Sequence, residues 1–255
     1  MSTGTLNTAV EFDPLYFGLR QKEGRIYTDE EVATLPFIYT SHPYYHDWVM
    51  RKHSQKALLS YINSKKIFSN ILEVGCGNGW LSSRIAKETK ADVTGLDINT
   101  YELQQAERVF RNVSNLNFIS GSLQSDQFRD EKFDMILFAA SIQYFPSLKQ
   151  IIQIAIEHLT LQGEVHIMDS PFYHIQETAA ASQRTKEYYK ALGFEAMEDG
   201  TWFVGSKVMN DELWNRVKAG EVLGFSIEID ADVKLEGEEP EDDIIEEMEK
   251  ILNQE

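Results

Sequence analysis

The chain has 255 residues, 42% of them hydrophobic and 25% charged, which is the composition of an ordinary globular protein with room for one large domain. Its formal net charge of −17 argues against a nucleic-acid partner, because binding to phosphates requires clustered lysine and arginine. The sequence contains no membrane-spanning apolar run and no signal-peptide pattern. Cys76 is the single cysteine, so an internal disulfide cannot form. We therefore expect a cytoplasmic protein with no membrane association.

The first 66 residues are expected to form an N-terminal helical segment. The sequence TDEE at 28–31 is a capping box that predicts a short helix, and residues 43–66 predict a longer one with Pro43 in its first turn. The remainder of this segment has no clear period and is read as irregular, although it is rich in aromatic residues: Phe12, Tyr16, Phe17, Tyr27, Phe37 and Tyr39.

From residue 70 onward, short apolar runs alternate with patterns of helical period. The run at 132–140 is apolar almost throughout, as expected of a strand that is covered on both faces. This alternation predicts an α/β fold, a Rossmann-like doubly wound and mostly parallel sheet with right-handed crossovers. The expected strands are 70–75, 91–98, 115–120, 132–140 and 163–170, and the expected helices are 79–89, 99–112, 147–159 and 177–192.

The last sixty residues are expected to add strands and helices to this core. Two short strands, 194–197 and 201–209, are separated by an Asp-Gly hairpin signal, and a helix is expected over 210–220. Residues 231–255 carry eleven acids against two lysines, which is read as a solvated helical face. The apolar stripe within 244–252 is a candidate contact for a homodimer. We therefore expect a central domain at 67–209 and an acidic C-terminal appendage at 210–255.

The sequence EVGCGNG at 73–79 places three glycines where a strand passes into a helix. The dinucleotide fingerprint G-x-G-x-x-G is not met, because Trp80 stands at its last position, and no Lys-Ser/Thr pair follows as in a phosphate-binding loop. Asp97 follows Gly77 by 20 residues, at the end of the next strand, where a carboxylate can accept hydrogen bonds from the two hydroxyl groups of a ribose. The alternative is a tight turn with an exposed acid.

The stretches LEVGCGNGWLS and GLDIN resemble the first two motifs of class I S-adenosylmethionine-dependent methyltransferases. The stretches FDMILFAASIQYF and LQGEVHIMDSPFY look like the fourth and fifth strands of that family, so the resemblance covers about residues 43–195. It implies S-adenosylmethionine as the cofactor and a methyl transfer, for which we expect a small-molecule acceptor. A cofactor-binding or structural module without catalytic turnover is the alternative.

The resemblance also implies which residues contact the cofactor. Glu73 and the glycine-loop backbone would hold the methionine part, and Asp97 would hold the ribose. Ser122 stands where many members of the family have an acid, which leaves the adenine contact less well defined. The complete set of expected cofactor contacts is Glu73, Gly75, Cys76, Gly77, Asn78, Gly79, Asp97, Ile98, Ser122, Leu123, Ala139, Ala140 and Ser141.

Methyl transfer needs a base only when the nucleophile must lose a proton. His174 and Tyr144 follow the expected fifth and fourth strands and are the candidate catalytic residues, with a loop histidine and a packed tyrosine as the alternatives. The family commonly folds its N-terminal segment over the cofactor as a lid, to which Tyr44, Tyr45, His46 and Trp48 would contribute, unless they anchor the helix to the sheet. A metal site is not expected, because His46 and His53 are two helical turns apart.

Residues 200–230 show a second resemblance, to the end of a phage prohead-protease-like family. The resemblance covers about thirty residues, and the nucleophile-bearing part of such a protease is not evident, so no catalytic residue is carried over. The segment could supply the last strands of the sheet, form a separate appendage, or mark a chain of composite ancestry.

Overall fold

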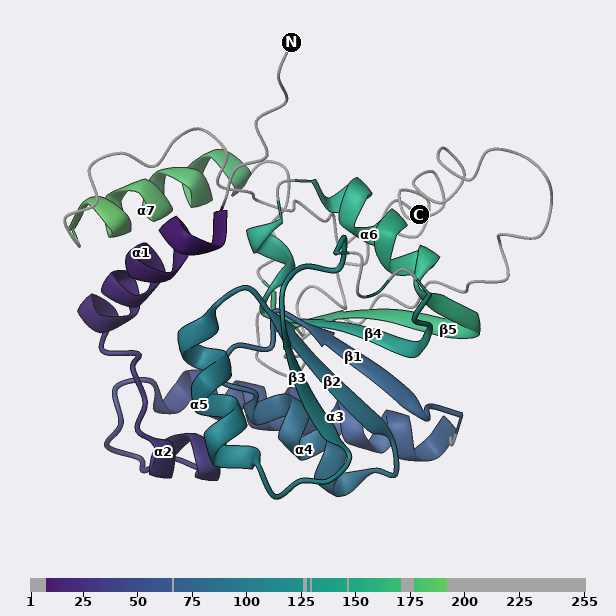
Figure 1. Ribbon diagram of the computed structural model, residues 1–255. Helices are drawn as coiled ribbons and strands as arrows, with labels where there is room; N and C mark the ends of the chain where they lie inside the picture. The colour runs from purple at the N-terminus through teal and green to yellow at the C-terminus, as the bar shows by residue number, and fades with distance from the viewer. Residues whose placement is uncertain are drawn as a thin grey trace, which may run out of the picture.

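The computed structural model describes residues 8–65, 67–125, 128, 130–145, 147–170 and 177–191. Five parallel strands form one sheet in the order β3-β2-β1-β4-β5, flanked by helices (Figure 1). The strands are β1 (Asn70–Val74), β2 (Asp92–Asp97), β3 (Leu116–Ser120), β4 (Phe133–Ala139) and β5 (Leu159–Met168). The helices are α1 (Thr8–Glu23), α2 (Asp29–Thr34), α3 (Tyr45–Lys65), α4 (Trp80–Glu88), α5 (Thr100–Phe110), the 3₁₀ turn η2 (Ile142–Tyr144), α6 (Leu148–Glu157) and α7 (Thr178–Ala191).

The strand order places a reversal point beside β1. The chain runs outward from β1 through β2 to β3, then returns to the other side of β1 with β4 and β5. In open parallel sheets, ligands bind beyond the carboxyl ends of the strands at such a point. The expected fold class is therefore confirmed, and the glycine loop follows the strand at the centre of the sheet.

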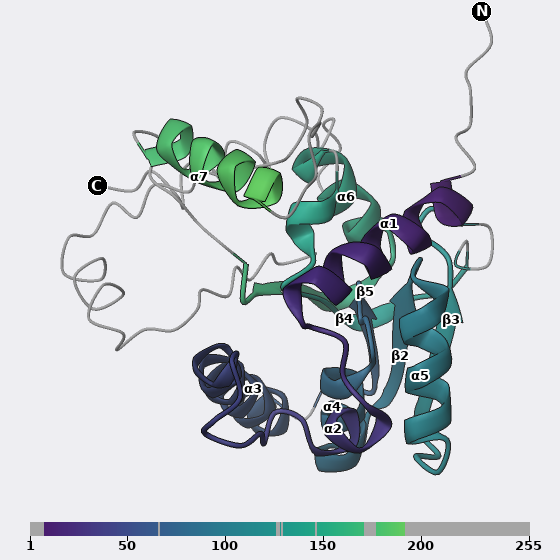
Figure 2. The same ribbon diagram turned by 90° about the vertical axis from the view of Figure 1, so that its left-hand side faces the viewer.

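The two faces of the sheet are covered by different helices. One apolar cluster joins α3, α4 and α5 to the sheet through residues such as Leu59, Ile85 and Phe110. The other joins α6 to the opposite face through Ile151 and Ile156, which pack with Phe138 and Val165. The alternation of helical and extended patterns in the sequence reflects this two-sided burial, and the two views show α6 on one side of the sheet and α3 and α4 on the other (Figures 1 and 2).

The N-terminal segment is more helical than its sequence pattern indicates. Residues 8–23 form α1, which includes three of the aromatic residues that were expected in irregular chain. Tertiary contacts account for the difference, since the Phe17 ring meets that of Tyr101 edge-on at 4.7 Å, and the Tyr188 hydroxyl donates to Glu23 Oε1 at 2.8 Å. These partners lie more than eighty residues away in sequence, where no local pattern reveals them.

The capping box at the start of α2 is confirmed. Glu31 N–H donates to Thr28 Oγ1 at 3.2 Å, and Thr28 N–H donates to Glu31 Oε2 at 2.8 Å. The helix then binds α5 through Asp29, which accepts from Arg108 Nε at 2.6 Å and from Gln105 Nε2 at 3.0 Å. These contacts fix α2 on the surface of α5.

Strand β5 begins at Leu159, four residues before the expected start at Gly163. The pairing of β4 with β5 shifts register between Phe133 and Met135, and Gly163 packs so tightly there that an added Cβ would lie 2.8 Å from the Phe133 carbonyl oxygen. The glycine thus lies inside the strand at a local irregularity rather than at its beginning.

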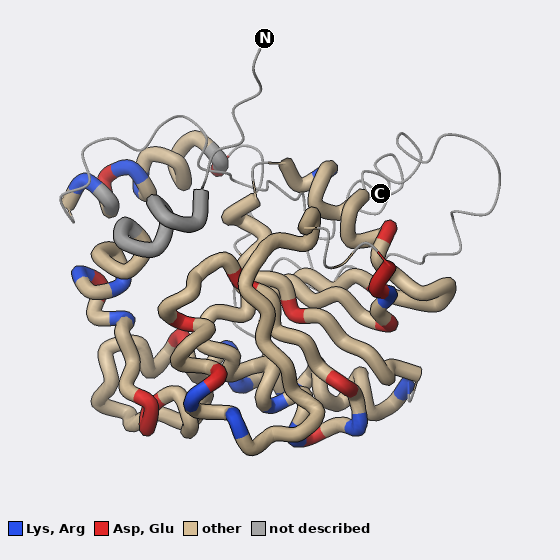
Figure 3. The backbone as a smooth tube through the Cα atoms, viewed as in Figure 1, with Lys and Arg blue, Asp and Glu red and all other residues tan. Residues whose placement is uncertain are grey.

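Several expectations concern residues that lie outside the described part of the chain. These are the strands and helices at 194–255, the acidic appendage, the apolar stripe within 244–252 and His174. Acidic and basic positions are interspersed along the described chain (Figure 3). In that part of the chain, no helix is both long enough and apolar enough to span a bilayer.

Candidate functional site

The glycine loop after β1 is shaped by left-handed backbone and by close packing. Gly75, Gly77 and Gly79 have φ values of +76°, +54° and +71°, a region that residues with a Cβ rarely adopt. The N–H of Gly75 donates to the Leu96 carbonyl oxygen at 2.8 Å, which fixes the loop to the end of β2. A Cβ on Gly75 would lie 2.4 Å from Ser141 Cβ, so the loop also abuts the end of β4.

Asp97 connects the end of β2 to the loop. Its Oδ2 accepts from Gly77 N–H at 2.7 Å, and its Oδ1 accepts from Asn99 N–H at 2.8 Å. These two bonds orient the carboxylate at the end of β2, where the resemblance places the ribose of the cofactor. Asp97 and the glycine loop are thus joined by a direct hydrogen bond.

Glu102 is a site residue that the sequence pattern did not indicate. Its Oε2 accepts from Asn99 Nδ2 at 3.3 Å and would lie 3.1 Å from a Cβ built on Gly77. Asn99 also caps α5, since its Oδ1 accepts from the N–H of Tyr101 at 3.1 Å and of Glu102 at 3.2 Å. An Asn followed three residues later by Glu is a capping-box spacing, and this signal could have placed Glu102 facing back toward the loop.

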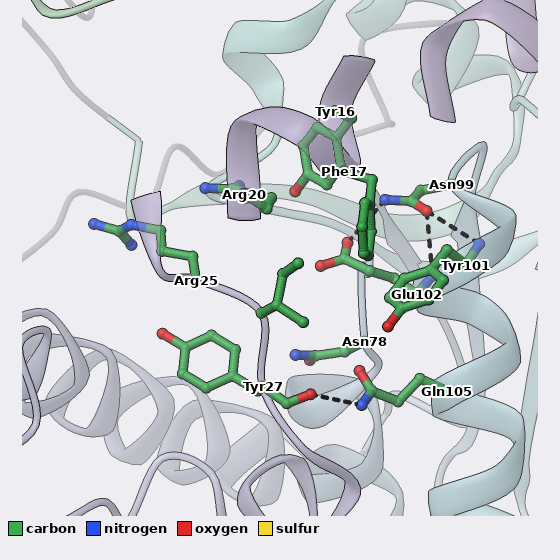
Figure 4. A pocket seen from close by; sticks show the side chains of 11 residues that line it. Tyr16, Phe17, Arg20, Arg25, Tyr27, Asn78, Asn99, Tyr101, Glu102 and Gln105 are labelled. Carbon is green, nitrogen blue, oxygen red and sulfur yellow. Dashed lines mark hydrogen bonds between the residues drawn. The ribbon is translucent and has the colours of Figure 1, made fainter. Parts of the chain in front are cut away.

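A pocket lies between α1 and the amino-terminal end of α5, beyond the ends of β1 and β2 (Figure 4). Asn78 of the glycine loop lies on one side of it, and the Glu102 side chain points into it below Tyr16 (Figure 4). Arg20 stacks its guanidinium on the Tyr16 ring, with Cζ 4.7 Å from the ring centroid. Helix α1 therefore covers the ends of the strands where the resemblance places the ribose of the cofactor (Figure 2).

Three carboxyl groups, those of Glu73, Asp97 and Glu102, lie around the glycine loop. The pKa of Glu73 is raised to about 8, chiefly because the group is buried. The hydrogen bond that the Ser82 hydroxyl donates to the Glu73 carboxylate opposes this rise, and the nearby charge of Asp97 adds to it. Burial likewise raises the pKa of Glu102 to about 7, again with a contribution from Asp97 that Arg20 opposes. Burial and the same three acids raise the pKa of the Cys76 thiol. The electrostatics of the loop thus favour a positively charged ligand over an anion.

The buried Glu73 makes stability depend on pH. Its pKa is 4.5 when unperturbed and about 8 in the folded chain, so the folded state binds more protons between these values and stability falls as the pH rises through them. Glu73→Gln is expected to reduce the loss of unfolding free energy between about pH 5.5 and about pH 8 by about 2–3 kcal/mol. Urea denaturation at the two pH values measures this. In the control Glu107→Gln, at an exposed position, the loss of unfolding free energy should equal that of the wild type. If Glu73→Gln also lost as much as the wild type, Glu73 would not be the group responsible.

The remaining expected cofactor contacts lie near the same strand ends, with differing exposure. Ile98 is half-buried directly after β2, and Ser122 is half-buried after β3. Leu123 is 1% exposed and packs in the apolar core with Phe138, so its side chain is directed away from an open site. Ala139 and Ala140 end β4, and Ala140 has a φ of +53°. Ser141 donates from Oγ to the Val74 carbonyl oxygen at 2.5 Å, which joins β4 to the start of the loop.

The expected lid residues make contacts that join α3 to the chain before it. Trp48 is 5% exposed, packs edge-on against Trp80 at 5.3 Å and donates from Nε1 to the Tyr27 hydroxyl at 3.0 Å. Tyr44 donates to the carbonyl oxygen of Glu23 and lies under the guanidinium of Arg25. Tyr45 is half-buried and His46 is exposed. Trp48 thus joins α3 to α4 and to the chain before α2, while Tyr44 binds the end of α1 and the residue Arg25 that follows it.

Of the two candidate bases, the structure describes one. Tyr144 ends η2 and has 56% of its surface exposed. It lies close enough to Arg20 and Tyr16 to raise the pKa of both side chains. His174 falls in the undescribed stretch 171–176. Within the described ranges, no group of three or more His, Cys, Asp or Glu side chains is arranged to hold a metal ion.

Comparison with known proteins places most of this chain in one family. The model of a family described as a methyltransferase domain matches residues 67–223, which is more than half of the chain. That match includes residues 200–223, the greater part of the segment for which the sequence suggested a phage-protease resemblance. None of the relatives described below supports that resemblance, since all of them are methyltransferases.

The individual relatives are more distant. The malonyl-(acyl-carrier protein) O-methyltransferase of Bacillus cereus is 29% identical over 138 residues, which are 53% of this chain and 50% of that protein. The sterol 24-C-methyltransferase ERG6A of Gibberella zeae is 37% identical over 84 residues, 32% of this chain and 22% of that protein. The chain thus spans about half or less of the length of these relatives.

One solved structure supports the fold. The plantazolicin methyltransferase BpumL, in complex with a triazolic desmethylPZN analog and SAH, is 16% identical, with a TM-score of 0.51. The alignment covers 84% of this chain and 72% of that one. At this identity the likeness concerns the arrangement of strands and helices and not the ligands.

Proposed function

Because the chain belongs to the methyltransferase domain family, we propose that it transfers a methyl group from S-adenosylmethionine to a small-molecule acceptor. The cofactor would supply an activated methyl group on a positively charged sulfur, and the protein would supply alignment. Asp97 would accept hydrogen bonds from the ribose, and the left-handed backbone of 75–79 would admit the methionine part. The other cofactor contacts expected from the sequence keep their proposed roles, apart from the Leu123 side chain, which is buried in the core.

The observation that carries this proposal is the gathering of three carboxyl groups around one glycine loop. Asp97 raises the pKa values of Glu73 and Glu102, and all three carboxyl groups raise that of Cys76, so a further anion is disfavoured there. A loop that binds phosphates instead presents N–H groups and lysine to its ligand. The sulfonium and amino groups of S-adenosylmethionine are positively charged and therefore suit the acids of this loop.

The finer assignments remain proposals. We place a lid at 1–66, the cofactor-binding domain at 67–209 and an acidic appendage at 210–255. His174 and Tyr144 are proposed to receive a proton where the acceptor must lose one, and Tyr44, Tyr45, His46 and Trp48 to limit access of water. A cytoplasmic location and a homodimer contact within 244–252 likewise stay predictions from the sequence.

Calorimetry with S-adenosylhomocysteine tests the proposed function. We expect saturable binding to the full chain, and we expect Gly77→Val to abolish it, because the new side chain would collide with Glu102 and strain a φ of +54°. No heat of binding at millimolar ligand would contradict the proposal. Binding without methyl transfer to any acceptor in an extract of small metabolites would favour the non-catalytic module instead.

A further inference from the structure

Two neighbouring strand ends carry acceptor oxygens that are buried without a partner. Among the buried side-chain nitrogens and oxygens of the described residues, Gln143 Oε1 and Asp169 Oδ2 have no hydrogen-bond partner. Gln143 lies in η2 directly after β4, and Asp169 directly follows β5. A buried acceptor without a donor costs free energy, so two of them at one edge of the sheet require an explanation.

The backbone at both strand ends is held in an uncommon conformation. Ala140 after β4 and Asp169 after β5 have φ values of +53° and +55°, and neither is glycine. The Ala140 N–H donates to the Met168 carbonyl oxygen at 2.8 Å, so the two turns are joined. Non-glycine residues with such dihedrals are concentrated at functional sites, where the surrounding structure offsets their cost.

The other polar atoms of these two side chains are fixed. Asp169 Oδ1 accepts from Ser54 Oγ of α3 at 2.6 Å, and Gln143 Nε2 donates to the Ala140 carbonyl oxygen at 2.7 Å. Each side chain is therefore oriented by one bond while its second polar atom stays unpaired. Arg51 of α3 lies near enough to lower the pKa of Asp169, against the larger effect of burial, and its guanidinium lies 5.2 Å from the Trp48 ring centroid.

The order of the strands relates this pair to the proposed cofactor. The ribose-binding Asp97 ends β2, the glycine loop follows β1, and Ser141 packs on Gly75 at the end of β4. Asp169, at the end of β5, is the next position in that order, on the side away from the ribose. A carboxylate and an amide oxygen both accept hydrogen bonds, so a ligand that satisfies them must donate.

We infer that Asp169 and Gln143 form the subsite for the methyl acceptor and that they select an acceptor with an N–H-bearing, positively charged amine group. This inference rests on the proposed function for its location beside the cofactor. The amine would donate to Asp169 Oδ2 and Gln143 Oε1, and its charge would offset that of the buried carboxylate. Asp169 thereby acts as a binding residue for the acceptor, with Ser54 as the residue that positions it.

Small ions test the subsite without knowledge of the natural acceptor. The full chain, labelled with ¹⁵N, is titrated with methylammonium chloride and separately with sodium acetate, each with and without saturating S-adenosylhomocysteine. Sodium chloride serves as the reference for ionic strength. We expect methylammonium to shift the amide signals of Ser141 and Ser170 with a dissociation constant on the order of 10 mM, near the limit for so small a ligand. Acetate should not shift them.

Variants separate the subsite from a general effect of charge. Asp169→Asn removes the carboxylate charge and replaces one of the two acceptor oxygens by an N–H donor. It should therefore weaken methylammonium binding at least about 10-fold. The exposed Glu157→Gln makes the same change of charge on α6 and should have no effect. Unchanged affinity of Asp169→Asn for S-adenosylhomocysteine shows that the variant is folded.

The outcomes are distinct. The inference is overturned if methylammonium causes no shift, if acetate causes the same shift, or if Asp169→Asn binds methylammonium as the wild type does. Absence of S-adenosylhomocysteine binding by the wild type instead overturns the proposed function, and the titration without this ligand still decides whether the amine subsite exists.

Discussion

Replacing Gly75 with alanine is expected to abolish S-adenosylhomocysteine binding and to lower the unfolding free energy by about 2–5 kcal/mol. A Cβ at φ +76° costs about 1–2 kcal/mol, and overpacking costs about 1–3 kcal/mol more. The overpacking arises because the new Cβ would lie 2.4 Å from Ser141 Cβ and 3.0 Å from its Oγ. Ser141 holds the Val74 carbonyl oxygen and cannot move away without breaking that bond.

Urea denaturation and calorimetry measure the two effects of Gly75→Ala. The matched control is Gly18→Ala in α1, where an added Cβ meets nothing within 4 Å and where alanine should stabilise the helix by about 0.5–1 kcal/mol. If Gly75→Ala were as stable as the wild type and bound the ligand normally, the loop could not be packed against β4 as described.

Replacing Asp97 with alanine is expected to weaken S-adenosylhomocysteine binding about 100-fold. Hydrogen bonds to a charged group contribute about 1.5–3 kcal/mol, and 1.4 kcal/mol corresponds to a factor of ten in affinity. The variant also releases the N–H groups of Gly77 and Asn99, which orient the loop and the first turn of α5. Asp97→Asn keeps one acceptor oxygen and should lose less affinity.

Calorimetry against Asp92→Asn provides the control for this variant. Asp92 is exposed at the opposite end of the same strand, so its substitution changes the charge equally without contact with the site. Removal of the Asp97 charge should also lower the pKa values of Glu73 and Glu102, because that charge raises both. An affinity unaltered by Asp97→Ala would place the ligand elsewhere on the molecule.

The sheet and the glycine loop could be predicted because both depend on local pattern. Strand β4 is apolar apart from Asp134 because both its faces are covered, and the glycines of 75–79 occur where the backbone is left-handed. The spacing of Asp97 follows from one strand–helix–strand unit, so the contact of its carboxylate with Gly77 was foreseeable. These features require only neighbours in sequence.

Features that depend on distant partners could not be predicted in the same way. Helix α1 is held through Phe17 and Glu23 by residues of α5 and α7. Glu102 lies on a helix in which apolar residues such as Leu103 and Ala106 recur with helical period, so the pattern does not single out Glu102. Its place in the site follows from the close approach of Gly77 to its carboxylate. The unpaired oxygens of Gln143 and Asp169 emerge only when every partner has been located.

The single thiol of the chain has a consequence for handling and for redox chemistry. Cys76 lies within the glycine loop at 4% exposure, and an added Cβ on Gly95 would come within 2.9 Å of its Sγ. Thiolates, not thiols, react with oxidants and alkylating reagents, and burial among acids keeps this group protonated. Cys76 is therefore shielded from oxidants while the chain is folded, and its modification would report local unfolding of the loop.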